Sequence, residues 1–189
     1  MRAPKKIPLP FGHDSIFNCV GRITFGSFSD ILMDRFATPR PVFSILSSVM
    51  FACSCYIIAE SYSGPLLYLA CILGATAYGG LVSSMIVVVS DFFGPRYVSA
   101  LAKNISFSAF IGSYVFATVL IGTLYDDEMK RQGGDRGDAT CEGLDCFRTS
   151  MLILTVLNCL NIILCVILIF ISKHIYTRKW QRAQDEKIK

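Results

Sequence analysis

Long uncharged segments dominate the chain. Residues 41–59, 61–90, 104–125 and 149–172 contain no Asp, Glu, Lys or Arg, and each segment is about 20 residues long or longer. An α-helix rises about 1.5 Å per residue, so each segment is long enough to cross a hydrocarbon core of about 30 Å. The pattern therefore predicts four membrane-spanning helices.

A fifth candidate, residues 14–29, is more polar because Arg22 lies in its middle. The chain has 53% hydrophobic and only 17% charged residues, which is outside the range typical of soluble globular domains. Buried helices of a soluble protein are the alternative, but such helices need polar faces that these segments lack. We expect an all-α polytopic transmembrane helix bundle of about five spans, forming a single membrane domain over residues 1–189.

The distribution of Lys and Arg predicts the orientation of the bundle, because short cytoplasmic loops are enriched in these residues. Basic residues gather in 30–40, 91–103 and the tail 173–189, which we assign to the cytoplasmic side. The turn 60–64 and the loop 126–148 belong to the opposite, extracytoplasmic side. In that loop seven acidic residues outnumber four basic ones. The sequence does not distinguish which membrane is involved.

The N-terminal segment 1–12 does not fit this scheme. Five spans would place it outside, yet it carries Arg2, Lys5 and Lys6 and has no continuous apolar signal region. Either 14–29 does not span, or the chain begins within a longer protein. We favour the second explanation, since a first helix this polar normally has upstream neighbours that cover it.

Charged residues and glycines cluster just before the first uncharged segment, over Gly21, Arg22, Gly26, Asp30, Asp34, Arg35 and Arg40. Gly26, Asp30 and Arg35 resemble the loop motif of the major facilitator superfamily (MFS) of secondary transporters. That motif reads Gly, three residues, Asp, then a basic residue, any residue, Gly and two basic residues. Ile31, Met33 and Asp34 depart from it.

The second half of the chain extends the resemblance to the nodulin-like branch of this superfamily. That branch has a Gly-Ser-Tyr helix ending in Leu-Tyr-Asp, then a Cys-x-Gly-x-x-Cys-Phe-Arg segment before the last span. The corresponding residues here are Gly112, Ser113, Tyr114, Leu124, Tyr125, Asp126, Cys141, Gly143, Cys146, Phe147 and Arg148. The resemblance implies that the spans correspond to helices 8–12 of a twelve-helix transporter of a small solute. It also implies that an N-terminal half, helices 1–7, is required for transport.

In this family the loop containing the motif acts as a cytoplasmic latch between helices that separate during transport. Asp30 would lie at the C-terminal end of its helix, where a carboxylate opposes the helix dipole. We therefore expect it to contact Arg35, Arg40 or the N-terminus of a helix that Pro95 opens near Arg96. The alternative is an ordinary solvated loop. Gly21 and Gly26 are expected to let neighbouring helices approach closely.

Polar residues within the spans are candidates for a substrate path or for hydrogen bonds between helices, because hydrocarbon offers them no partner. They are Ser83, Ser84, Asn104, Ser108, Ser113, Tyr114 and Asn158. Cys141 and Cys146 lie in the only long loop and are expected to pair if that loop faces an oxidising compartment. The other cysteines are interpreted as small hydrophobic residues.

Other functional classes have less support from the sequence. It shows no phosphate-binding glycine loop, metal-ligand constellation or nucleophile–His pair, so we expect neither an enzyme nor a cofactor. The basic tail suits anionic lipid, so we expect the lipid bilayer and not nucleic acid as its partner. A non-transporting membrane remnant, scaffold or assembly partner is the alternative to a transporter.

The charge distribution yields a prediction of topology. In intact cells, a membrane-impermeant thiol reagent should modify a cysteine introduced into loop 126–148 and spare one introduced into tail 173–189. Labelling of the tail alone would invert the assignment.

Overall fold

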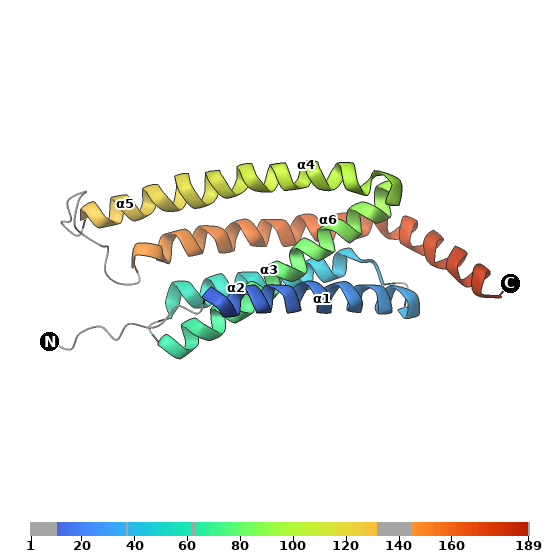
Figure 1. Ribbon diagram of the computed structural model, residues 1–189, viewed down its shortest axis with the longest axis horizontal. Helices are drawn as coiled ribbons and strands as arrows, with labels where there is room; N and C mark the ends of the chain where they lie inside the picture. Colours follow the sequence, from blue (N-terminus) through green and yellow to red (C-terminus); the bar gives the residue numbers. More distant parts are fainter. Residues whose placement is uncertain (1–10, 37, 62, 132–144, 189) are drawn as a thin grey trace.

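The described part of the chain consists of helices. A computed structural model describes residues 11–36, 38–61, 63–131 and 145–188, and no strand occurs among them. The elements are α1 (Phe11–Phe36), α2 (Pro41–Glu60), α3 (Gly64–Phe93), α4 (Pro95–Ser113), the π-helical segment η1 (Tyr114–Ile121), α5 (Gly122–Arg131) and α6 (Asp145–Ile188). Figure 1 shows α4, η1 and α5 as one continuous helical rod, so the architecture is five long helices.

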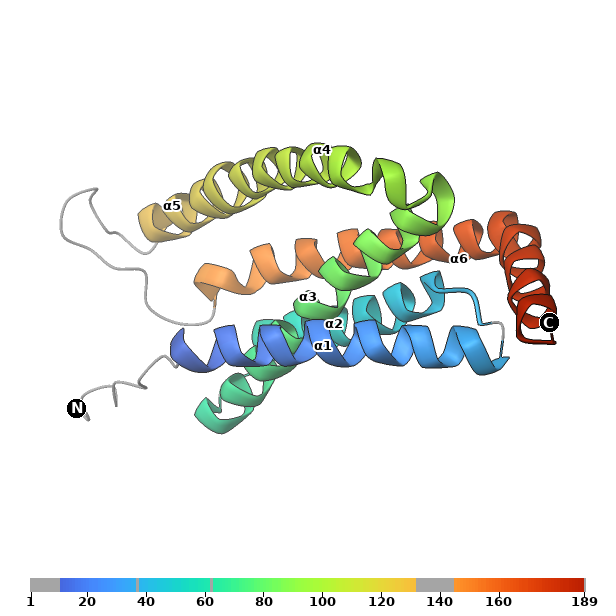
Figure 2. The same cartoon turned by 45° about the vertical axis from the view of Figure 1, so that its right-hand side comes forward.

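These five helices run alternately up and down the bundle. In Figures 1 and 2, α1, α3 and α6 run in one direction, and α2 and the α4–η1–α5 rod run in the other. The α1–α2 connection, the α3–α4 connection and the C-terminal part of α6 therefore lie at the same end. We call this the basic end, because it holds the three Lys- and Arg-rich segments. Which side of a membrane it faces remains a prediction.

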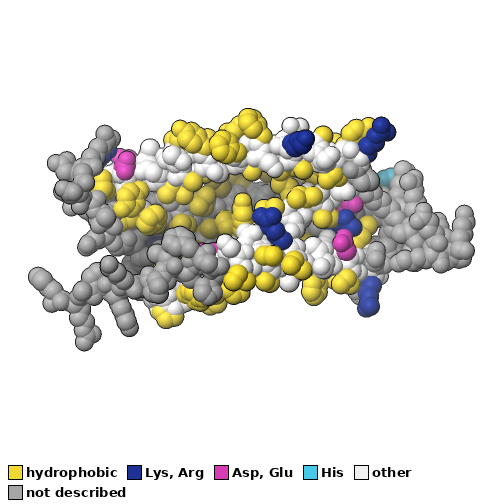
Figure 3. All heavy atoms as spheres, in the orientation of Figure 1, with side chains coloured by type: hydrophobic (Ala, Val, Ile, Leu, Met, Phe, Trp, Pro, Cys, Tyr) yellow, Lys and Arg dark blue, Asp and Glu magenta, His cyan; other side chains and the backbone are white. Residues whose placement is uncertain are grey.

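Four helical stretches are long and apolar enough to cross a membrane: Pro41–Glu60, Gly64–Phe93, Arg96–Arg131 and Cys146–His174. They coincide with the four uncharged segments and are those of a multi-pass membrane protein. Helix α1 is 26 residues long and packs along α3, but it is not among these four. Figure 3 shows hydrophobic side chains along the visible face, with few charged ones between them.

Helical structure extends into both ends of the predicted outer loop 126–148. Helix α5 continues to Arg131 and α6 begins at Asp145, so only the middle of that loop lies outside the described residues. Two ion pairs spaced three residues apart, Lys130–Asp127 and Arg131–Glu128, support the extension of α5.

Proline and glycine mark the helix ends. Pro41, Pro65 and Pro95 each occupy the first turn of a helix, where the missing N–H is not needed. Gly94 has φ of +80°, a conformation that favours glycine, and its N–H donates to the Ser90 carbonyl at 2.9 Å. This residue turns the chain directly from α3 into α4, and the predicted helix start at Pro95 is confirmed.

Helix α2 packs against both α3 and α6 through hydrogen bonds. Ser54 Oγ donates to the Ala70 carbonyl of α3 at 2.7 Å. From α6, Asn158 Nδ2 donates to the Ser48 carbonyl at 2.6 Å, and Asn161 Nδ2 donates to Ser48 Oγ at 2.9 Å. Small residues and interhelical hydrogen bonds of this kind hold helices together where the surrounding lipid is as apolar as the side chains.

Helices α1 and α3 meet backbone to backbone at two glycines. A Cβ on Gly21 would collide with the Thr76 carbonyl oxygen, and one on Gly79 would collide with the Asn18 carbonyl oxygen. The predicted close approach is thus confirmed for Gly21. It is wrong for Gly26, since no described atom lies within 4 Å of a Cβ built there.

The two glycines of α1 provide a matched test of this contact. Gly21→Ala forces α1 and α3 apart and should destabilise the protein by about 1–3 kcal/mol, as overpacking does. Gly26→Ala meets no neighbour and should be neutral, or stabilising by up to about 1 kcal/mol through helix propensity. Thermal unfolding in detergent micelles measures both. Equal melting temperatures for the two variants would refute the contact.

Candidate functional site

Three charged residues from three elements meet at the basic end of the bundle. Arg40 Nη2 lies 3.0 Å from Asp30 Oδ1 of α1, and Arg40 Nε lies 3.5 Å from Asp91 Oδ2 of α3. We call Asp30, Arg40 and Asp91 the ion-paired cluster. A guanidinium presents several N–H donors in one plane, so a single arginine can serve two carboxylates.

Local structure explains why both carboxylates need a cation. Asp91 lies in the last turn of α3, and Asp30 lies in the C-terminal part of α1. Negative charge near a helix C-terminus is unfavourable, because the last carbonyl groups point towards it. Arg40 occupies the position just before Pro41, at the N-terminus of α2, and its side chain reaches carboxylates of the other two helices.

The two ion pairs differ in their exposure to solvent. The Asp30 side chain is 64% exposed, whereas those of Arg40 and Asp91 are 23% and 11% exposed. Exposed ion pairs contribute about 0–1 kcal/mol, so the sheltered Arg40–Asp91 pair should contribute more to closing this end.

Arg40 is thus the cationic partner that the sequence predicted for Asp30. Arg35, the other candidate, forms no ion pair within the described part of the chain. No role was predicted for Asp91 from the sequence, in which it is only the residue that ends an uncharged segment. Its position one residue after the predicted span, opposite an arginine-rich loop, was the available signal.

Arg22 lies away from this cluster, on the exposed side of α1. Its Nε donates to Asn18 Oδ1 one turn earlier at 3.0 Å. Its backbone carbonyl accepts a hydrogen bond from Ser83 Oγ of α3 at 3.2 Å, close to the Gly21–Thr76 contact. The Arg22 region therefore contributes to helix packing.

The predicted substrate-path residues do not converge on one place. Ser83 and Asn158 bond to the backbone of neighbouring helices, and Ser84 is buried on α3 without a hydrogen bond among the described residues. The remaining four lie exposed on the α4–η1 rod: Asn104, Ser108, Ser113 and Tyr114. Two of the seven thus serve contacts between helices.

A cavity lies in the half of the bundle away from the basic end. Its volume is about 610 Å³, and α1, α2, α3 and α6 all contribute to its wall. We call it the four-helix cavity. None of the predicted path residues lines it; the residues that do are Asp14, Ser15, Asn18, Phe51, Ser54, Cys55, Ile58, Cys71, Gly74, Ala75, Tyr78, Met151 and Leu154. The signal for it in the sequence was Asp14, a single acidic residue at the start of an otherwise apolar stretch.

A second interhelical ion pair lies at the end opposite the basic end. Arg148 Nη2 at the start of α6 is 2.8 Å from Glu60 Oε1 at the end of α2. Beside it, the rings of Tyr125 and Phe147 lie 5.5 Å apart between centroids. These contacts join α2, α5 and α6 beyond the apolar segments.

The cysteines fall into two groups. Cys146 is disulfide-bonded, whereas Cys19, Cys53, Cys55, Cys71, Cys159 and Cys165 are free. Cys141, the predicted partner of Cys146, lies outside the described residues, so the pairing stays a prediction. No group of three metal-ligating side chains occurs within the described ranges.

The chain has no match among known proteins in three separate comparisons: no protein-family model, no curated protein and no solved structure matches it. Its function is therefore inferred from its own residues.

The ion-paired cluster predicts a non-additive response to mutation. Arg40→Gln removes the cation beside two carboxylates and should lower the free energy of unfolding by about 1–3 kcal/mol. Adding Asp91→Asn should restore part of that loss, because the sheltered carboxylate is then also gone. Arg35→Gln, in the last turn of α1, should change stability by less than about 0.5 kcal/mol. Thermal unfolding of wild type, Arg40→Gln, Asp91→Asn and the double variant completes the cycle. Strictly additive losses would exclude the Arg40–Asp91 interaction.

Proposed function

We propose that this chain transports a small solute across a membrane as part of an MFS-type secondary transporter. In this proposal its helices correspond to helices 8–12, and an N-terminal half of helices 1–7 completes the transport path. The observation that supports it best is the ion-paired cluster. Asp30, the acidic position of the motif, lies 3.0 Å from Arg40, at the end of the bundle where the resemblance expects a latch.

The cluster has the properties that a latch requires. It joins α1, the N-terminus of α2 and the end of α3, so these helix ends cannot separate without breaking ion pairs. A transporter alternates between states that open to opposite sides of the membrane, largely by movements of helix groups around a central site. Ion pairs made in only one of these states bias the equilibrium by their free energy.

The two carboxylates differ in their exposure to solvent, so the loss of each ion pair should shift that equilibrium by a different amount. Losing the Asp30 pair, which is largely exposed, should shift the equilibrium by about 0–1 kcal/mol, or up to roughly fivefold in population. Losing the sheltered Asp91 pair, whose atoms lie 3.5 Å apart, should shift the equilibrium further, because a pair away from water is screened less. Asp91 should therefore be the stronger determinant of the closed state, although Asp30 is the residue that the motif identifies.

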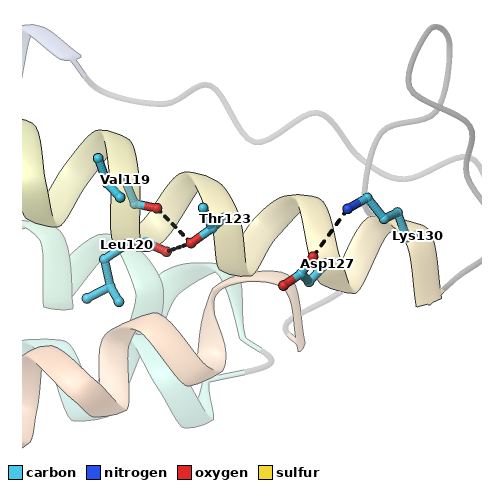
Figure 4. A network of polar contacts seen from close by, with 5 residues as sticks. All are labelled: Val119, Leu120, Thr123, Asp127 and Lys130. Atoms are coloured by element: carbon cyan, nitrogen blue, oxygen red, sulfur yellow. Dashed lines mark hydrogen bonds and ion pairs between the residues drawn. The ribbon is translucent and has the colours of Figure 1, made fainter.

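The test is uptake by proteoliposomes containing the complete reading frame of the transcript, screened over organic cations, organic anions, sugars and metal ions. Asp91→Asn should alter uptake and the accessibility of the basic end to thiol reagents more than Asp30→Asn does. Asp127→Asn is the matched control. That residue is exposed on α5 and, within the described part of the chain, pairs with Lys130 of its own helix alone, at 3.3 Å, among the contacts shown in Figure 4.

Two results would count against the proposal. One is folded protein that takes up none of the four solute classes. The other is uptake that responds to Asp30→Asn and Asp91→Asn no more than to Asp127→Asn.

The α4–η1 rod favours a second candidate, a non-transporting scaffold or assembly partner. Large apolar side chains stand exposed along it, including Phe107, Phe110 and Tyr114, and the rod contacts the described helices mainly near its two ends. Lipid or another membrane helix would cover such a surface. A stable membrane partner that copurifies with the chain, together with absent uptake, would favour this alternative.

A further inference from the structure

Among the described residues, one charged side chain lines the four-helix cavity. It is Asp14, in the first turn of α1. Its Oδ1 atom is buried and has no hydrogen-bond partner within the described part of the chain. A carboxylate oxygen without a donor or a cation is costly in an apolar environment, so this wall of the cavity favours a positively charged ligand.

The position of Asp14 at a helix N-terminus does not replace a cationic partner for its carboxylate. The helix dipole stabilises a negative charge there, but a capping interaction would also engage the carboxylate in hydrogen bonds with backbone N–H groups. Oδ1 makes no such bond to any residue that the structure describes. The fold therefore holds the charge in place while this oxygen has no partner among those residues.

The other residues that line the cavity favour an organic ligand over a bare metal ion. Phe51 and Tyr78 supply aromatic rings, and Ile58, Met151 and Leu154 supply aliphatic surface. A volume of about 610 Å³ lies within the range of small-molecule sites. The faces of aromatic rings attract organic cations. Hard metal cations instead require several oxygen ligands, which usually include more than one carboxylate.

We propose that the four-helix cavity binds a monovalent organic cation, an ammonium-bearing solute with an apolar body. Its ammonium group lies against Asp14, with Asn18 beside it on the same face of α1, and its apolar part lies among Phe51, Tyr78 and the aliphatic side chains. This inference deepens the proposed function, on which it rests: it names the class of solute that the transporter takes and a binding place inside this group of helices.

Equilibrium binding tests the site directly, on the chain in lipid nanodiscs. The probe is a fluorescent monovalent styrylpyridinium dye, followed by anisotropy, with phenethylammonium and the anion phenylacetate as competitors. Phenethylammonium should displace the dye and phenylacetate should not. Asp14→Asn should weaken dye binding by about tenfold or more, the effect expected for a charge-assisted contact.

Two further variants separate the site from non-specific effects. Asp127→Asn removes the same charge at the same end of the bundle but outside the cavity, and it should change dye affinity by less than twofold. Ala75→Leu leaves every charge in place and fills part of the cavity, so it should also weaken binding. Melting temperatures confirm that each variant is folded, and protection of the Cys71 thiol from alkylation by bound dye reports occupancy of the cavity in a folded protein.

Binding that is equal in wild type, Asp14→Asn and Ala75→Leu would show that the dye only partitions into apolar surface, and this would overturn the proposal. Folded wild type that binds no dye would overturn it as well. The assay requires no transport, so its failure is distinguishable from failure of the proposed function. If another solute class is taken up and the dye does not bind, only the proposed cation binding in the cavity is refuted. If the dye binds and no solute is taken up, only the proposed transport is refuted.

Discussion

The backbone contact between α1 and α3 fixes the rest of the candidate site. Gly21 and Gly79 let the two helices touch where a methyl group on either would collide with a carbonyl oxygen of the other. Helix α1 is not among the four stretches that are apolar enough to span a membrane, and this contact packs it against α3, which is one of them. Asp14 precedes the contact and Asp30 follows it, so they lie about 24 Å apart along the helix axis. One contact thereby places one carboxylate in the four-helix cavity and the other beside Arg40.

Polar side chains elsewhere in the bundle serve mainly to hold helices together. Ser48 receives hydrogen bonds from two asparagines of α6, and Ser54 donates to α3, so α2 is connected to helices on both sides. In hydrocarbon a polar group must find a protein partner or a hydrated cavity. Three such bonds use the backbone carbonyl of the neighbouring helix, whereas Asp14 Oδ1 has no partner among the described residues.

The two ends of the bundle are held by ion pairs of different exposure. At the basic end Arg40 reaches two carboxylates, one of them sheltered, whereas Arg148 and Glu60 at the other end are each about half exposed. Sheltered pairs are screened less by water and salt. The four-helix cavity lies in the half of the bundle away from the basic end.

The sequence by itself determined the class of fold and the ends of the bundle. Uncharged segments of sufficient length must form helices in hydrocarbon, and the Lys- and Arg-rich connections between them gather at one end because consecutive helices alternate in direction. It also narrowed the partner of Asp30 to a few groups, because a carboxylate near a helix C-terminus needs a cation. Only the tertiary structure selected Arg40 over Arg35, added Asp91, left Gly26 without a close neighbour among the described residues and placed Asp14 at a cavity between four helices. Those features depend on which faces of the helices meet, and uncharged helices that are apolar all round carry no periodic signal that specifies their faces.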